Sequence, residues 1–275
     1  MCIRDSYSRA TVISDAKRHG LRVRPVCVIA SAAATRVEDD TTIRLGLGQV
    51  KGLSSTAIRQ ILAVPKNSLT LEAFLLATQL TKSERRILAK IGALNSLENA
   101  HHRRAALWSA EQTLVQGDLF QQHPATQAPP PLKPMRPFER IAADYDGLGL
   151  STGGHPMALL REKLPHAWRA IDLSQGRHHQ HLIIAGAVIC RQRPGTAKGH
   201  VFISLEDETG VANAFVPSAT FEAYRLTIVT ERFLQITGRL QVSEGGVRSL
   251  YALKIEKLPV GETASTPAGA SHDFH

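Results

Sequence analysis

The chain lacks the features of a membrane, secreted or zinc-bound protein. None of its apolar runs approaches the roughly 20 residues of a membrane span, so we expect a soluble protein. The three cysteines, Cys2, Cys27 and Cys190, are scattered and lack C-x-x-C spacing, which indicates neither a disulfide framework nor a zinc site. The first residues carry no apolar core of a secretory signal. These absences favour a cytoplasmic location.

Two clusters carry metal-ligand residue types without a metal-binding pattern. His178, His179 and His181 lie close together, but no second ligand cluster stands at helical or knuckle spacing, so we expect no metal. The acidic run at 206–208 is interpreted as a hairpin turn in which Gly210 supplies a positive φ, rather than as a metal site.

Positive charge is what the chain has in excess. Lys and Arg number 33 against 24 Asp and Glu, a formal net charge of +9. The sequence pI is near 9.8. A surface of this kind favours polyanionic partners, with nucleic acid first among them. At 43% hydrophobic residues, the 275-residue chain can also form one large or two modest cores.

A first nucleic-acid element is predicted in LGLGQVKGLSSTAIRQIL, residues 45–62. A short apolar helix, a turn at Gly52 and a second helix resemble a helix-hairpin-helix. In that motif backbone amides beside the glycine bind phosphate without reading the base. Lys51 and Arg59 would add charge. A weaker copy of the turn is IGAL, residues 91–94.

A second element is predicted near the end of the chain, where five runs have the pattern of strands and a helical run, 218–225, separates the third from the fourth. Five strands with a helix at that place are the order of an OB barrel. The strand runs are 182–190, 201–206, 211–216, 233–242 and 247–256.

The loop between the first two strands is predicted to bind single-stranded DNA. Arg191, Arg193 and Lys198 would follow the backbone, and Phe202, outward-facing if its neighbours fill the barrel, would stack on a base. The alternative is a mobile, solvated hairpin with Phe202 tucked under a neighbouring element.

Four ordered motifs together resemble a known family. They are YSRATVISDAKRHGLRVRPV, RLGLGQVKGL, DYDGLGLSTGGHPMALLR and RQRPGTAKGHVFISLEDETGVANAFV. The set is similar to the C-terminal third of bacterial C-family replicative polymerases, the alpha subunit of polymerase III. It is closer to the error-prone, damage-inducible branch, to which RQRPGTAKG and the final DFH point. The resemblance implies DNA synthesis past lesions, in DNA replication and damage-induced DNA repair. One departure is 29–40, where the family usually has an Asn/Ser-Asp-Trp-Asp segment.

The resemblance also implies what this chain does not carry. In the family, the aspartates that hold two Mg²⁺ ions lie in an upstream palm domain. We therefore assign no catalytic residue and no cofactor to this chain, and we expect it to be inactive alone.

A clamp-binding peptide is implied by QGDLF, residues 116–120. In the family a Gln-x-x-Leu-Phe segment binds the sliding clamp. Leu119 and Phe120 would enter an apolar pocket, and Gln116 would hydrogen-bond at its rim. The alternatives are that these residues anchor a helix end, or that a translesion accessory protein reaches the clamp instead.

The expected fold class is α+β: a small helical helix-hairpin-helix region, a Pro-rich linker and a five-stranded OB-fold barrel. Two other functions remain open, a stand-alone OB-fold single-stranded DNA-binding protein without enzymatic activity and a scaffold module without DNA contact. The expected layout is 1–6 a sequencing scar, 7–42 the end of a fingers-like region, 43–122 helix-hairpin-helix, 123–137 linker, 138–177 helical connector, 178–258 OB-fold and 259–275 flexible tail.

Overall fold

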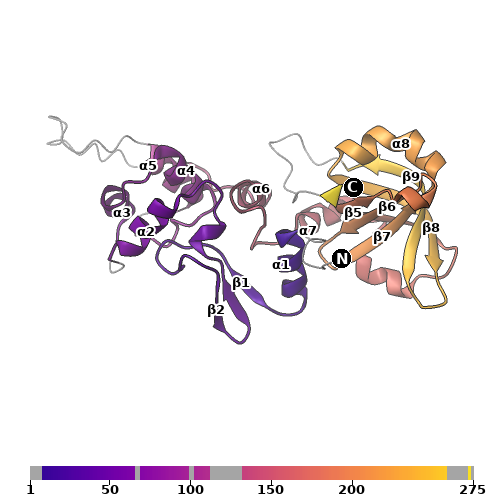
Figure 1. The fold of residues 1–275 in the computed structure, drawn as a ribbon, viewed down its shortest axis with the longest axis horizontal. Coiled ribbons are helices and arrows are strands. Elements are labelled where there is room, and N and C mark those ends of the chain that lie inside the picture. Colours follow the sequence, from indigo (N-terminus) through magenta and orange to yellow (C-terminus); the bar gives the residue numbers. More distant parts are fainter. Residues whose placement is uncertain (1–7, 66–68, 99–101, 112–131, 259–271, 274–275) are drawn as a thin grey trace. The chain divides into compact units, whose positions relative to one another are not determined.

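The computed structural model describes residues 8–65, 69–98, 102–111, 132–258 and 272–273. The chain divides into two compact units, whose elements are labelled in Figure 1. The helical unit is Leu21–Leu148, and the barrel unit combines Met1–Gly20 with Gly149–His275. Within the described ranges, no helix is both long and apolar enough to cross a membrane.

Side-chain caps define where the short helices of the helical unit begin. Ser54, Thr70 and Thr81 each accept a hydrogen bond from a backbone N–H three residues on. The Thr-x-x-Glu spacing of Thr81 and Glu84 predicts a capping box, and the two residues form it, which satisfies two helix-terminal donors reciprocally. The helices are η2 (Leu47–Gln49), α2 (Ser55–Ala63), α3 (Leu71–Ala77), α4 (Lys82–Lys90), α5 (Arg103–Glu111) and α6 (Pro137–Leu148).

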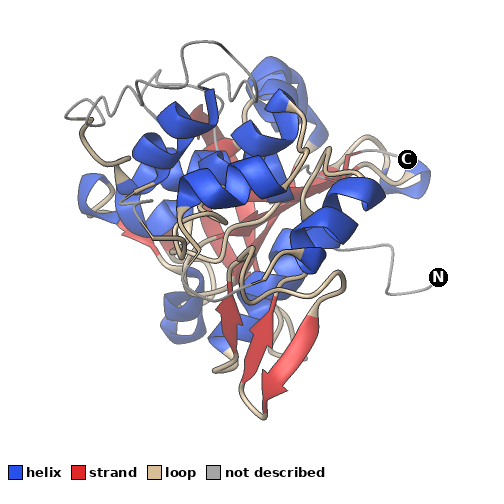
Figure 2. Ribbon diagram, turned by 90° about the vertical axis from the view of Figure 1, so that its left-hand side faces the viewer, coloured by secondary structure: helices blue, strands red, loops and turns tan. Residues whose placement is uncertain are grey.

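A three-stranded sheet in the order β1-β3-β2 completes this unit. Figure 2 shows its strands below the helices. The strands are β1 (Arg22–Arg24), β2 (Arg36–Asp39) and β3 (Thr42–Arg44). The alternation of residues 21–29 predicts a short strand after Gly20, and β1 confirms it. Residues 30–40, which are small and then charged, predict a loop, but they contain β2. The carboxylate of Asp39 accepts the Thr41 N–H and closes a hairpin that the sequence pattern did not reveal.

Helix α6 belongs to the helical unit and does not form a connector between domains. The carbonyl of Gly147 accepts the Lys51 N–H at 2.8 Å. A Cβ on Gly147 would lie 2.4 Å from the Ile91 side chain, so glycine permits this close approach. The division between units thus falls at Leu148 and Gly149, not at the predicted linker, 123–137, most of which lies outside the described residues.

The barrel has the predicted five strands in the strand order of an OB-fold. The sheet path β5-β6-β7-β9-β8 closes through the pairing of β5 with β8, and β7 and β9 are parallel. Helix α8 (Ser218–Thr230) lies between the third and fourth strands and covers one end of the barrel (Figure 1). The strands are β5 (His181–Gln192), β6 (Val201–Glu206), β7 (Val211–Val216), β8 (Phe233–Val242) and β9 (Arg248–Lys257).

The barrel interior is filled by alternate residues of its strands. Val201, Ile203 and Leu205 of β6 are at most 2% exposed, and Phe221 and Ile228 of α8 join the same cluster. This period of two leaves the intervening side chains on the outer face.

Further elements of the barrel unit come from both ends of the chain. Helix α1 (Arg9–Arg18), expected in a separate region at 7–42, belongs to this unit. Strand β10 (His272–Asp273) pairs in parallel with β5 within the expected flexible tail, whose residues 259–271 lie outside the described ranges. The other elements are α7 (Pro156–Leu160), η3 (Arg161–Lys163), β4 (Ala167–Trp168), η4 (Ala170–Gln175) and η5 (Gly195–Ala197).

Candidate nucleic-acid interface

An aromatic row crosses the outer face of the barrel. Phe202 of β6 is 43% exposed, as the alternation of β6 predicts, and its ring centroid lies 5.5 Å from that of Phe215 on β7. Tyr251 of β9 is the next ring, 5.8 Å from Phe215. His200 lies 5.0 Å from Phe215, and the Arg239 guanidinium lies 5.8 Å from the Tyr251 ring centre. We call these five residues the aromatic face.

Strand register assembles this face. Phe202 pairs with Phe215, Phe215 with Tyr251, and Tyr251 with Arg239. Directly paired residues point to the same side of a sheet. Of these rings, only Phe202 is predicted from the pattern of its own strand; Phe215 and Tyr251 follow from aligning the outward positions of the third and fifth strands.

The cationic loop between β5 and β6 is divided between exposed and buried charge. Arg193 and Lys198 are exposed, as a phosphate contact requires. Arg193 lies 4.8 Å above the Phe221 ring and 3.8 Å from the Glu222 carboxylate. Lys198 adopts a left-handed conformation with φ 49°.

Arg191, by contrast, is only 3% exposed, and its guanidinium donates to the carbonyl of Glu231. A register shift in β5 between Val188 and Cys190 precedes it. Its burial argues against the predicted phosphate contact, and we leave Arg191 out of the interface.

The acidic turn after β6 pairs with the protein's own arginines. Arg161 contacts Asp207 at 3.2 Å and Glu208 at 2.8 Å. Arg18 of α1 contacts Glu206 at 3.0 Å. The turn therefore anchors the elements that flank the barrel. Throughout the described residues, no group of three His, Cys, Asp or Glu is placed to hold a metal ion.

Asp207 also shapes this turn directly. Its Oδ1 accepts the N–H groups of Thr209 at 2.8 Å and Gly210 at 3.0 Å. Gly210 does not have a positive φ, so that prediction is wrong. The Asp207 side chain supplies the turn geometry that glycine was expected to supply.

Two buried titratable groups lie beside each other at the α1 anchor. Burial raises the pKa of Glu206 to about 7, although the hydrogen bond from Arg18 acts to lower it. Burial lowers the pKa of His155 to about 4 against the pull of Asp207 and Glu208. The His155 Nε2 and a Glu206 oxygen are 4.0 Å apart. As pH rises, the contributions of these two groups to the stability of the fold therefore change in opposite directions.

The turn at Gly52 has the conformation that the helix-hairpin-helix pattern predicts. Gly52 has φ 77°, is exposed, and has nothing within 4 Å of the place a Cβ would occupy. The Lys51 ammonium donates to the Tyr145 carbonyl at 3.1 Å, so this side chain also ties the turn to α6. Arg59 is exposed on α2. A phosphate can therefore approach the backbone at Gly52.

The second turn, at Gly92, has the same backbone conformation in different surroundings. Gly92 has φ 78°, but a Cβ there would lie 2.6 Å from the Arg103 guanidinium. Arg103 donates to Asp144 at 2.7 Å and to the Lys90 carbonyl at 3.3 Å. Arg103 therefore covers this turn.

The clamp-binding candidates Gln116, Leu119 and Phe120 lie outside the described residues. Their role stays a prediction.

Comparison with known proteins agrees with this geometry. Residues 20–106 match a family described as a helix-hairpin-helix motif, and residues 182–258 match the OB-fold nucleic acid binding domain. The chain is thus built from two domains of nucleic-acid-binding type.

Its relatives make the relationship more specific. It is 38% identical over 277 residues to the error-prone DNA polymerase of Dechloromonas aromatica and 37% identical over 284 residues to that of Azoarcus sp.. Each alignment covers 98% of this chain and 26% of the relative. The resemblance to error-prone DNA polymerases is confirmed, and the chain spans about a quarter of the length of these relatives. Among solved structures, asparaginyl-tRNA synthetase from Pyrococcus horikoshii matches 33% of this chain and 22% of its own at 19% identity with a TM-score of 0.29, too low to bear on function.

Proposed function

We propose that this chain is the DNA-binding part of an error-prone DNA polymerase, in which the barrel binds single-stranded template and the Gly52 turn holds duplex backbone. The observation that carries the proposal is the aromatic face, which lies on the strand surface that OB-folds use for oligonucleotides.

On the barrel, aromatic side chains would stack on bases and cationic side chains would contact phosphates. Phe202 and Tyr251 offer ring faces to bases, and each stacked base contributes about 1–3 kcal/mol independently of its identity. Arg193 and Lys198 on the adjoining loop, with Arg239 on the face itself, supply charge for the phosphates. This combination binds single strands without strong sequence preference, as a template-binding surface requires.

The Gly52 turn contributes by a different route. Its exposed backbone and the nearby Arg59 can hold a phosphate without contacting a base, which suits duplex that has left the site of synthesis. The turn would position the duplex and add no sequence information.

The whole protein would perform the synthesis. By the names of its relatives, we infer that the whole protein is an error-prone DNA polymerase. We further propose that it copies past lesions in DNA replication and repair, in the cytoplasm. Its Mg²⁺ ions would be held by carboxylates of the remaining three quarters. This chain alone should extend no primer, which a primer-extension assay with Mg²⁺ would test.

Partners of the whole protein would include the sliding clamp or a translesion accessory protein. A peptide spanning 113–123, titrated against the clamp, should bind saturably and lose binding when Leu119 and Phe120 are replaced by Ala. Binding that is absent, or indifferent to these replacements, would return the segment to a structural role.

The DNA-binding test uses the chain as it stands. A labelled oligothymidylate of about 15 nucleotides, a length within the range that one OB-fold covers, is titrated with protein by fluorescence anisotropy. Phe202→Ala combined with Tyr251→Ala removes the stacking of two bases and should weaken binding by at least about 30-fold.

Leu226→Ala is the control, because Leu226 is 77% exposed on α8 and outside the aromatic face. Equal affinity of the double variant and the control would remove the aromatic face from the binding site.

A further inference from the structure

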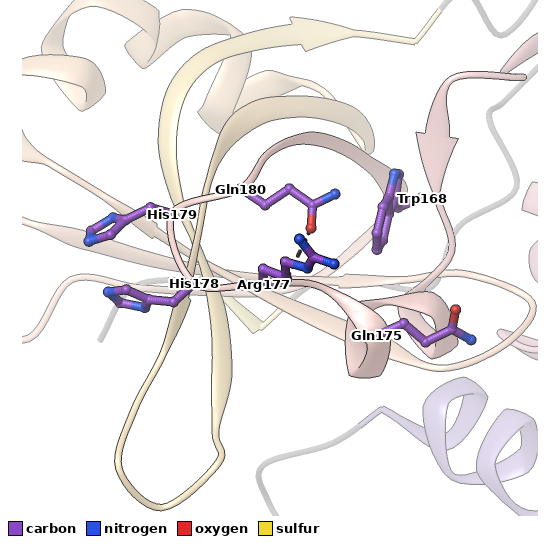
Figure 3. A pocket seen from close by; sticks show the side chains of 6 residues that line it. All are labelled: Trp168, Gln175, Arg177, His178, His179 and Gln180. Carbon is purple, nitrogen blue, oxygen red and sulfur yellow. Dashed lines mark hydrogen bonds between the residues drawn. The ribbon is translucent and has the colours of Figure 1, made fainter.

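We infer that the hollow lined by Trp168, Arg177 and Gln180 holds one nucleotide of the same single strand, beyond the end of the aromatic face. This inference rests on the proposed function and extends it to a site outside the strand surface that OB-folds use. Figure 3 shows the hollow, whose volume is about 580 Å³ and whose remaining lining residues are Gln175, His178 and His179.

The outward-facing row leads directly to this hollow. Arg239 pairs with His181 at the first residue of β5, and His181 is exposed. The hollow begins one residue earlier, at Gln180. From Phe202 to His181 the row takes four steps between neighbouring strands, a path of about 19 Å at about 4.8 Å per step. A single-stranded DNA that follows the aromatic face therefore reaches the hollow directly.

Hydrogen bonds and close packing attach the turn that lines the hollow to the barrel. The N–H of His179 donates to the Leu240 carbonyl at 2.7 Å, and the Leu240 N–H donates back to Gln180 at 2.8 Å. A Cβ on Gly176 would lie 2.3 Å from the Leu240 side chain and 3.6 Å from the Trp168 ring, so glycine lets the turn pass this close. On the far side, Trp168 lies on β4, which pairs with β5.

The lining has the chemistry of a nucleotide. Arg177 and Gln180 extend toward the Trp168 ring, while the rings of His178 and His179 lie together on the other side of the turn (Figure 3). The indole face can stack on a base, the guanidinium can pair with a phosphate, and side-chain amides can hydrogen-bond base edges. The lining includes no carboxylate that would repel a phosphate.

Trp168 reports on its own site. The sequence has two tryptophans, Trp108 and Trp168, so Trp108→Phe leaves the indole of the hollow as the single tryptophan, which can be excited selectively over the tyrosines. Titration of this variant with an oligothymidylate of about 15 nucleotides should quench the fluorescence as the strand binds. Thymidine 5′-phosphate at the same nucleotide concentration should not, because it lacks the contacts of the aromatic face.

Two substitutions in the Trp108→Phe background test the hollow against a matched control. Arg177→Ala should weaken strand binding about 5- to 10-fold and reduce the quenching at saturation. Lys163→Ala removes the same charge from an exposed position outside the hollow and should change neither. Arg177 is exposed, so its loss should not unfold the barrel.

The possible outcomes distinguish failure of the hollow as a nucleotide site from failure of single-strand binding by the barrel. Strand binding that leaves Trp168 unquenched and is indifferent to Arg177→Ala would overturn the hollow and leave the aromatic face intact. Equal quenching by the mononucleotide would overturn the strand as occupant. If the unsubstituted chain binds no single-stranded DNA at all, the proposed function itself is overturned.

Discussion

The two proposed nucleic-acid contacts use different parts of the chain. At the Gly52 turn the helical unit exposes backbone, and two of its nearby polar groups are already used to hold α6. On the aromatic face the barrel exposes side chains from three strands, and the backbone beneath them is paired in the sheet. Backbone recognition therefore depends on space around a glycine, whereas side-chain recognition depends on strand register. Changes to one should leave the other intact.

The largest effect should come from opening the covered turn. Arg103→Ala removes a guanidinium that donates to Asp144, whose side chain is 5% exposed, and should lower the unfolding free energy of the helical unit by about 2 kcal/mol. Chemical denaturation followed by the fluorescence of Trp108 in a Trp168→Phe background measures this. Arg104→Ala, which breaks a half-exposed pair with Glu139, is the control and should cost less than about 1 kcal/mol. Binding of single-stranded DNA by the barrel should persist in both; its joint loss would mean that the units are not independent.

The second effect is a change in the stability of the barrel unit with pH, between about pH 4 and 7. Glu206 has a folded pKa near 7 against 4.5 when unfolded, so its contribution to stability falls as pH rises from about 4.5 to 7. His155, near 4 against 6.5, contributes stability that rises from about pH 4 to 6.5. Glu206→Gln should leave only the rising trend, and His155→Asn, which keeps an acceptor for the helix cap, only the falling one. Denaturation followed by the fluorescence of Trp168 in a Trp108→Phe background over pH 4 to 7 tests both signs, and parallel pH curves in the two variants would contradict them.

The third effect concerns the open turn. Gly52→Val places a side chain where a phosphate must approach, and duplex affinity should fall about tenfold while single-strand affinity persists. Gly20→Val is matched, because Gly20 also has a positive φ and open surroundings but lies in the barrel unit. It should carry similar backbone strain without the loss of duplex binding. Equal loss of both affinities by Gly52→Val would break the comparison between the units.

The smallest effect is expected from the cationic loop. Arg193→Ala and Lys198→Asn should each reduce the slope of log affinity against log salt by roughly 0.7 for single strands, since each removes one phosphate contact. Asparagine suits the left-handed conformation at 198. Arg191→Ala should instead lower stability and leave the slope unchanged, because Arg191 is buried. A slope unaffected by the loop variants would remove the loop from the interface.

Local patterns were predictable from the sequence, and long-range ones were not. The capping box of Thr81 and Glu84 and the outward position of Phe202 depend on residues a few positions apart. The burial of Arg191 depends on tertiary contacts with Glu231, and the aromatic face depends on a register among strands far apart in sequence. The position of a charged residue beside a loop does not by itself predict that its side chain is exposed, because a register shift in the preceding strand can turn the side chain inward.

The placement of α6 was missed for a related reason. A proline-rich stretch resembles a boundary between domains, but Arg103 pairs with Asp144 across 41 positions and brings the chain back to the same unit. No pattern local to either residue indicates that partnership.

Because α6 packs in the same unit as α5, the length of the connection between these two helices can vary. Helix α5 ends at Glu111 and α6 begins at Pro137, and the pair between Arg104 and Glu139 joins the two helices within one unit. For a chain segment with both ends anchored in this way, doubling its length costs only about 0.6 kcal/mol of closure entropy. Insertions or an affinity tag between these helices should therefore be tolerated by the fold, because neither proposed DNA-binding surface includes residues of this connection.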